Sequence, residues 1–222
     1  MSFYQIQLRK AQLPKLSQIR IVDFLFKNID KKPTQTEIAR ATGQAKSYKN
    51  VREALKELEK HGIVTIQKVG NYKTCSLNLM NHATLNYLVL IEHSKENDLF
   101  KKAKYVEEML NKIVQEILQH TANFSIVLFG SYAKGNYHEH SDVDLIAIAD
   151  KNKHENIKRT ISSIQSIYTK KINYFIVTEK EYAKMIANGN EVNIGTESLK
   201  YHIIIYGIEY FLTIVGNVYG KK

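Results

Sequence analysis

Two aspartates separated by one residue, Asp142 and Asp144, are the side chains of this 222-residue chain with the clearest chemical potential. They open an apolar segment typical of a β-strand, where alternate residues share a face, so the carboxylates should lie together. Hard divalent cations such as Mg²⁺ bind carboxylate oxygens and add phosphate and water ligands. Separated from Asp142 by ten residues, Gly130-Ser131 follows another apolar strand and offers backbone N–H groups and a hydroxyl to an anion. This combination fits phosphoryl or nucleotidyl transfer, which depends on positioning and charge neutralisation.

The pattern Gly-Ser, ten residues, Asp-x-Asp resembles the signature of the nucleotidyltransferase superfamily that includes DNA polymerase beta, especially its small stand-alone members. The alternative is a pair of solvated aspartates after an ordinary glycine turn. The flanking apolar strands and the connecting Lys134-Gly135 favour the family interpretation, and the resemblance covers about residues 106–215.

The resemblance implies a role for each residue of the pattern. Asp142 and Asp144 would hold Mg²⁺ or Mn²⁺ and carry the catalysis of nucleoside monophosphate transfer from an NTP. The nucleotide's phosphates would be bound by Gly130, Ser131 and Lys134. Arginine is more familiar at the last of these positions, and an ordinary solvated loop lysine is the alternative for Lys134.

One position departs from the family's pattern. Active members carry a third carboxylate on the strand after the next helix, and here the register of Lys171-Ile172-Asn173-Tyr174-Phe175-Ile176 puts Asn173 at that place. An amide oxygen can bind a metal, but it carries no charge and cannot act as a base at neutral pH. Glu179 and Glu181 lie roughly 20 Å further along an extended chain, so neither is an obvious substitute. The resemblance therefore predicts metal and nucleotide binding and leaves catalysis open.

A second group of potential metal ligands, His138-Glu139-His140, lies in the loop between Gly130-Ser131 and Asp142. Such a group could bind a transition metal. Loop His-x-His pairs are usually solvated, and nothing in the sequence fixes their geometry, so we expect no specific metal role.

The positive charge of the chain is concentrated near its N-terminus. Residues 1–80 contain 15 Lys and Arg against 6 Asp and Glu, whereas residues 81–222 contain 17 against 16. A domain-sized basic segment favours a polyanionic partner, although a solubilising basic surface is the alternative.

The pattern within this basic segment indicates three helices and a hairpin. Apolar residues at helical spacing run from Leu16 to Phe26, and Thr34 with Glu37 forms a capping box that opens a helix over 35–41. A third helix is expected over about 46–61, with Tyr48, Val51, Leu55 and Leu58 buried. Strands over 63–68 and 72–77 are joined by Gly70-Asn71.

This order resembles a winged helix-turn-helix, whose third helix enters the major groove of duplex DNA. Such domains also serve in dimerisation and protein binding, and a homodimer is a fair expectation. The residues that would contact DNA are Lys46, Ser47, Lys49, Asn50, Arg52 and Glu53 on the helix, and Lys68, Lys73 and Asn71 on the hairpin.

The remaining chain predicts an α/β (α+β) domain. An amphipathic helix over about 106–118 precedes the Gly-Ser strand, and the Asp-x-Asp strand is followed by a helix, a strand over 171–177, an apolar segment over 202–206 and a helix over 208–215. Such an order fits a small mixed sheet backed by helices. We expect domains over 1–80 and 106–222, joined by a helical connector over 81–105.

Composition limits the cellular setting. The single Cys75 excludes an internal disulfide framework and fits a reducing cytoplasm, while the absence of a long apolar run and of a signal peptide argues against a membrane.

Three functions remain open. The first is transfer of a nucleoside monophosphate from an NTP to a hydroxyl of a protein, a nucleic acid or a small molecule, and small relatives that modify a partner toxin are the analogy for a protein acceptor. The second is a DNA-binding transcription regulator whose degraded transferase domain binds nucleotide without efficient catalysis. The third is a scaffold in which both domains serve assembly.

Overall fold

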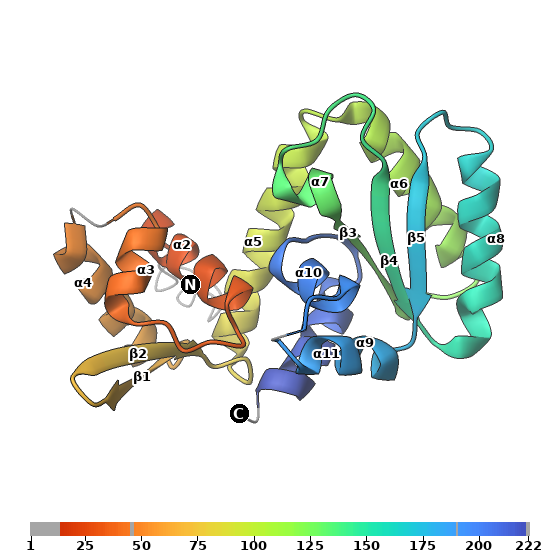
Figure 1. The fold of residues 1–222 in the computed structure, drawn as a ribbon. Helices are drawn as coiled ribbons and strands as arrows, with labels where there is room; N and C mark the ends of the chain where they lie inside the picture. Colours follow the sequence, from red (N-terminus) through yellow and green to blue (C-terminus); the bar gives the residue numbers. More distant parts are fainter. Residues whose placement is uncertain (1–13, 45–46, 190, 221–222) are drawn as a thin grey trace, which may run out of the picture.

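The computed structural model describes residues 14–44, 47–189 and 191–220. A helical unit with a hairpin lies on one side and a helix-backed sheet on the other, with helix α5 (His82–Phe100) between them (Figure 1). None of the helices in these described ranges is long and apolar enough to cross a membrane.

The N-terminal unit contains the elements that the sequence predicts. These are α2 (Leu16–Lys27), α3 (Gln35–Ala41), α4 (Tyr48–Lys60), β1 (Val64–Val69) and β2 (Tyr72–Leu77). The predicted capping box is present, since Thr34 accepts from the Glu37 amide while the Glu37 carboxylate accepts from the Thr34 amide. Thr34 also bridges to Thr74, which extends the hairpin by one short antiparallel contact.

The buried face of α4 differs from the prediction at its first residue. Val51, Leu55 and Leu58 are fully buried, but Tyr48 is 42% exposed, and its hydroxyl reaches Gln35. Tyr48 begins the helix, where the chain has not yet reached the packed interior. Lys46 lies outside the described residues.

Helix α5 lies within the predicted helical connector over 81–105. It runs through the polar residues Ser94 to Asp98, where Lys95 pairs with the buried Glu92 of the preceding turn. The helix packs against α2 on one side and against β6 (Ile203–Tyr206) and α11 (Ile208–Tyr219) on the other.

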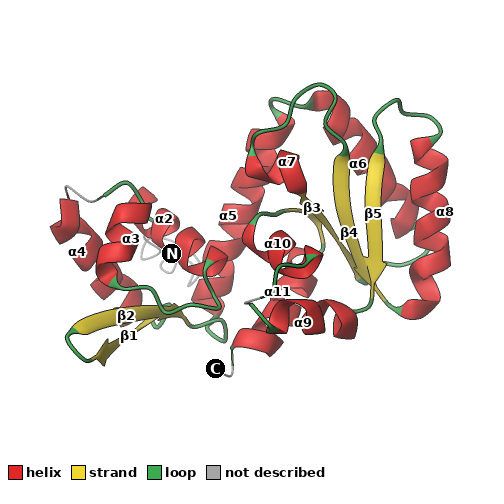
Figure 2. Ribbon diagram, in the orientation of Figure 1, coloured by secondary structure: helices red, strands yellow, loops and turns green. Residues whose placement is uncertain are grey.

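The C-terminal part forms the predicted small mixed sheet, in the strand order β5-β4-β3-β6. Figure 2 shows β5, β4 and β3 side by side. Strand β3 (Phe124–Phe129) pairs antiparallel with β4 (Val143–Ala149) and with β6, and β4 pairs parallel with β5 (Ile172–Val177). The other elements are α6 (Lys104–Leu118), α7 (Gly130–Lys134), the 3₁₀ helix η2 (Lys151–Lys153), α8 (His154–Gln165), α9 (Glu179–Ala187) and α10 (Ile194–Lys200). The apolar segment over 202–206 is therefore a strand.

Three helices of this part were not expected from periodicity, namely α7, α9 and α10. Helix α7 has only five residues. Helix α9 begins with a capping box of Thr178 and Glu181, and α10 with a box of Asn193 and Thr196. The first of these boxes follows the pattern already recognised at Thr34, so α9 carried a readable start signal.

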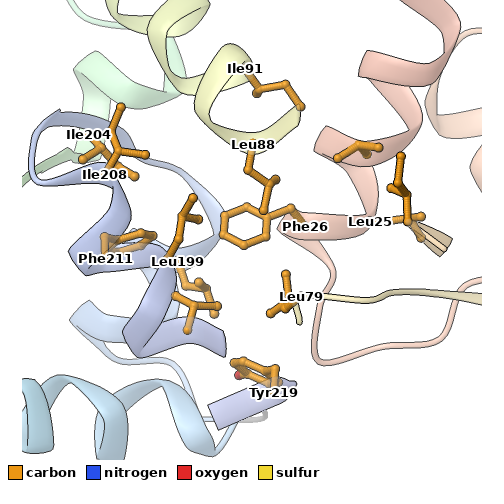
Figure 3. Close-up of a cluster of buried hydrophobic side chains, with 14 of the residues drawn as sticks. Leu25, Phe26, Leu79, Leu88, Ile91, Leu199, Ile204, Ile208, Phe211 and Tyr219 are labelled. Atoms are coloured by element: carbon orange, nitrogen blue, oxygen red, sulfur yellow. The ribbon is translucent and has the colours of Figure 1, made fainter. Parts of the chain in front are cut away.

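The two faces of the sheet are buried against different neighbours. Ile126 and Leu128 of β3 join the cluster that contains α6 and α8, whereas Val127 and Phe129 join the cluster that contains α10 and α11. The second cluster continues into the N-terminal unit, where Phe26 lies among Leu88, Leu199 and Phe211 (Figure 3). The two parts of the chain therefore share one hydrophobic core.

Candidate active site

The two aspartates meet a single amide at one end of the sheet. Asp142 immediately precedes β4, Asp144 lies within it, and the parallel pairing sets Asp144 opposite Asn173 of β5. The Asn173 Nδ2 donates to Asp144 Oδ1 over 3.0 Å and to Asp142 Oδ2 over 3.2 Å. Both carboxylates thus converge on the side chain that the sequence placed at the third position. The starts of β4 and β5 lie at the same end of the sheet as α7 (Figure 1).

Gly130 lets the chain pass directly over the Asp144 carboxylate. Its φ of +67° lies in the left-handed region, and an added Cβ would overlap Asp144 Oδ2. Ser131 follows as the second residue of α7 and is partly buried. Within the described residues no group hydrogen-bonds the Ser131 hydroxyl, which leaves it available to a ligand.

Two lysines that we did not single out from the sequence surround the first carboxylate. Lys171 Nζ lies 3.1 Å from Asp142 Oδ2, and this hydrogen bond, helped by Asn173, holds the pKa of Asp142 below its ordinary value against the effect of desolvation. Lys170 donates to the backbone carbonyls of Glu139 and Ser141, and so ties down the loop that leads to β4. Only the parallel pairing of β4 with β5 brings residue 171 beside residue 142.

Comparison with known protein families shows which family the C-terminal part of the chain resembles. Residues 107–212 match the family model of the nucleotidyltransferase domain. The C-terminal part of this chain is a nucleotidyltransferase domain. The matched range contains the glycine, the serine, both aspartates and Asn173.

The chain also has a similarity to a curated protein. A candidate protein adenylyltransferase from Methanocaldococcus jannaschii is 51% identical over 49 residues, which are 19% of this chain and 33% of that protein. The chain therefore matches only about a third of the length of that relative, and the likeness concerns a segment rather than a whole protein.

Lys134 of the nucleotidyltransferase domain does not join the carboxylates. Its Nζ lies 2.5 Å from Glu197 Oε1 on α10 and 5.7 Å from the centre of the Tyr201 ring. The ammonium group is thus held by an acidic partner more than sixty residues away in sequence, and contact with a phosphate would require it to leave this partner.

The histidines of the connecting loop are exposed. The ring centres of His138 and His140 are 6.5 Å apart. In the described part of the chain no three His, Cys, Asp or Glu side chains are grouped so that they could hold a metal ion. A cation at the Asp142–Asp144 pair would therefore have two carboxylates and one amide from the protein.

The residues predicted to contact DNA lie on the opposite side of the molecule from the sheet, on α4 and the hairpin (Figure 1). Ser47 precedes α4, and Lys49, Asn50, Arg52 and Glu53 are exposed on it. Lys68 and Lys73 are exposed and face each other across the hairpin, with exposed Asn71 in its turn. The hairpin also exposes two apolar residues that we did not select, Val69 and Tyr72, which are 58% and 69% exposed.

Proposed function

We propose that this protein transfers a nucleoside monophosphate from an NTP to a hydroxyl group of an acceptor, with a divalent metal ion held by Asp142 and Asp144. The observation that carries the proposal is the convergence of these carboxylates on Asn173 beside Gly130 and Ser131, within a nucleotidyltransferase domain.

The donor set at this end of the sheet fits Mg²⁺ or Mn²⁺. Hard cations take carboxylate and amide oxygens, and a half-turn of the Asn173 amide would exchange its donating Nδ2 for its accepting Oδ1. Lys171 favours the ionised form of Asp142, which is the form that binds metal. When bound, the ion would neutralise phosphate charge and assist the departure of pyrophosphate.

The start of α7 is the proposed site for the nucleotide's phosphates. The Ser131 hydroxyl is available as a donor, and Gly130 permits the approach of the backbone to Asp144. Lys134 could contribute charge there only after leaving Glu197.

The reaction forms a bond between the acceptor oxygen and the α-phosphorus while the bond from that phosphorus to pyrophosphate breaks. The proton of the acceptor hydroxyl must leave, and Asn173 cannot accept it. General-base assistance contributes about 10²–10⁴-fold in enzymes. We therefore expect slow transfer in which water takes the proton.

A second function, a DNA-binding regulator that senses nucleotide, is favoured by two observations. Asn173 stands where a carboxylate would complete the site, and α4 and the hairpin expose Lys49, Lys68 and Lys73. In this function nucleotide binding persists without turnover, and the protein binds duplex DNA.

Incubation of the full chain with α-labelled NTPs, Mg²⁺ and a cell extract separates the two functions. The transferase predicts label on an acceptor, lost in Asp142→Asn with Asp144→Asn. Asp150→Asn is the matched control, because Asp150 is exposed at the opposite end of β4. Nucleotide binding without label in any fraction would favour the regulator.

A further inference from the structure

A groove of about 730 Å³ opens beside Asp142, between the start of α6, the loop from α7 to β4 and the residues before β5. The lining residues that matter here are Lys102, Tyr105, Tyr137, Lys170 and Lys171. Since Asp142 forms part of the wall, a molecule in this groove would lie next to the proposed transfer site.

The lysines of the groove favour the binding of an anion. Lys102 is exposed, and no described carboxylate pairs with Lys102 or Lys170. Lys170 is fixed by backbone carbonyls and lies 6.0 Å from the centre of the Tyr132 ring, so its charge is held in place. The acids of the lining are Glu139 and Asp142, and we assign Asp142 to the metal ion.

The groove also presents aromatic rings whose orientation is fixed. Tyr137 stacks on Tyr132 with ring centres 4.3 Å apart. Tyr105 is 42% exposed, packs edge-on against Tyr168 at 5.3 Å and bonds through its hydroxyl to Thr169. Held rings beside lysines are the composition with which proteins bind the bases and phosphates of single-stranded nucleic acid.

We propose that this groove binds the acceptor, and that the acceptor is the 3′-terminal hydroxyl of a single-stranded nucleic acid. This proposal rests on the transferase function above. The terminal 3′ oxygen would bond to the α-phosphorus of the NTP, pyrophosphate would leave, and the hydroxyl proton would pass to water. The preceding phosphates would lie on the lysines. An acidic peptide would satisfy the lysines but would make no use of the exposed tyrosine ring.

The test is fluorescence anisotropy of a short single-stranded oligonucleotide with the full chain. Lys102→Glu and Tyr105→Leu should each weaken binding about tenfold, by loss of a phosphate contact and of a stacked base. Lys101→Glu is the matched control, because Lys101 is exposed and adjacent in sequence but outside the groove lining. It should leave binding within about twofold of wild type.

Two outcomes would overturn the proposal. One is oligonucleotide binding that Lys102→Glu leaves unchanged while Lys49→Glu abolishes it, which would place the nucleic acid on α4. The other is label transferred from α-labelled NTP to a protein and not to the oligonucleotide, in which case the transferase function stands and the acceptor class is wrong. NTP binding is a separate readout, because it depends on the carboxylates and the start of α7 and not on Lys102 or Tyr105.

Discussion

Asn173 determines how well the proposed site can work. Its Nδ2 bridges two carboxylates that would otherwise repel each other, and so reduces the repulsion between them. The place of Asn173 beside the two aspartates was predictable from the sequence, because the spacing of the motif and the start of β5 are local features. Lys171 was not predictable in this way, because its place beside Asp142 depends on a pairing between strands.

Asn173→Asp should bring three carboxylates together with almost no change in volume. Like charges at one site raise a carboxyl pKa and destabilise the fold until a cation neutralises them. We expect the melting temperature of the variant to fall below that of wild type in EDTA and to rise more than that of wild type with Mg²⁺. Any nucleotidyl transfer should increase. Equal responses of both proteins to Mg²⁺ in thermal denaturation would contradict the assigned position.

Gly130→Ala tests the contact with Asp144, and Gly135→Ala is its control. Both glycines have positive φ, so the backbone conformation alone should cost each variant about 1–2 kcal/mol of stability. An added Cβ meets Asp144 only at Gly130, whereas nothing lies within 4 Å at Gly135. Calorimetry should therefore show NTP binding lost in the first variant and kept in the second. Equal affinities in both would show that the close approach has no functional role.

At the scale of elements, local patterns predicted the helices of the N-terminal unit and the strands of the sheet. Periodicity over Leu16–Phe26 and the Thr34 capping box act within a few residues, which is why they were readable. Helices α9 and α10 are too short to show a long apolar periodicity, although the Thr178–Glu181 capping box marks the start of α9. The contact of Glu197 on α10 with Lys134 joins residues far apart in sequence, so it was not predictable. The predicted contact of Lys134 with phosphate stays a prediction, and in this structure its ammonium group is paired with Glu197.

Helix α4 and the hairpin carry the prediction of DNA binding. Lys49→Glu and Lys68→Glu should each weaken duplex DNA binding by the full chain and reduce the salt dependence of log K by about 0.9. Lys112→Glu, an exposed lysine on α6, should not. Asp142→Asn should also leave DNA binding unchanged. Filter binding at several salt concentrations measures this, and no retention of DNA by wild type at low salt would overturn the prediction.

At the scale of the whole molecule, a buried ionic network joins the two parts of the chain. Glu92 of α5 is fully buried, and its Oε1 lies 2.7 Å from Lys95 Nζ and 3.2 Å from His202 Nε2. Lys95 also lies 3.1 Å from Asp23 of α2. This network and the shared core around Phe26 were not predictable, because the residues come from distant parts of the sequence. They are also the reason to test the full chain rather than residues 1–80 alone.

Glu92→Gln should destabilise the protein by about 3–5 kcal/mol near neutral pH, since it removes the buried carboxylate that pairs with Lys95 inside the protein. Burial alone would raise the pKa of Glu92, but His202 and Lys95 outweigh it and lower the pKa to about 2. A lowered pKa gives stability that is present above the unfolded value of 4.5 and is lost as pH falls toward 2. The difference between wild type and variant should therefore shrink over this range in urea denaturation.

Glu96→Gln, one turn further along α5, is the control for this experiment and should change stability by less than about 1 kcal/mol. A difference between wild type and Glu92→Gln that stays constant from pH 6 to pH 3 would show that the Glu92 charge does not stabilise the junction.

Metal-dependent NTP binding at the carboxylates is the central claim, and isothermal titration calorimetry of NTP into the full chain tests it most directly. We predict binding in Mg²⁺, none in EDTA, none in Asp142→Asn with Asp144→Asn, and unchanged binding in Asp150→Asn. Equal NTP affinity in wild type and the double variant, or equal affinity with Mg²⁺ and with EDTA, would contradict the assignment of this site.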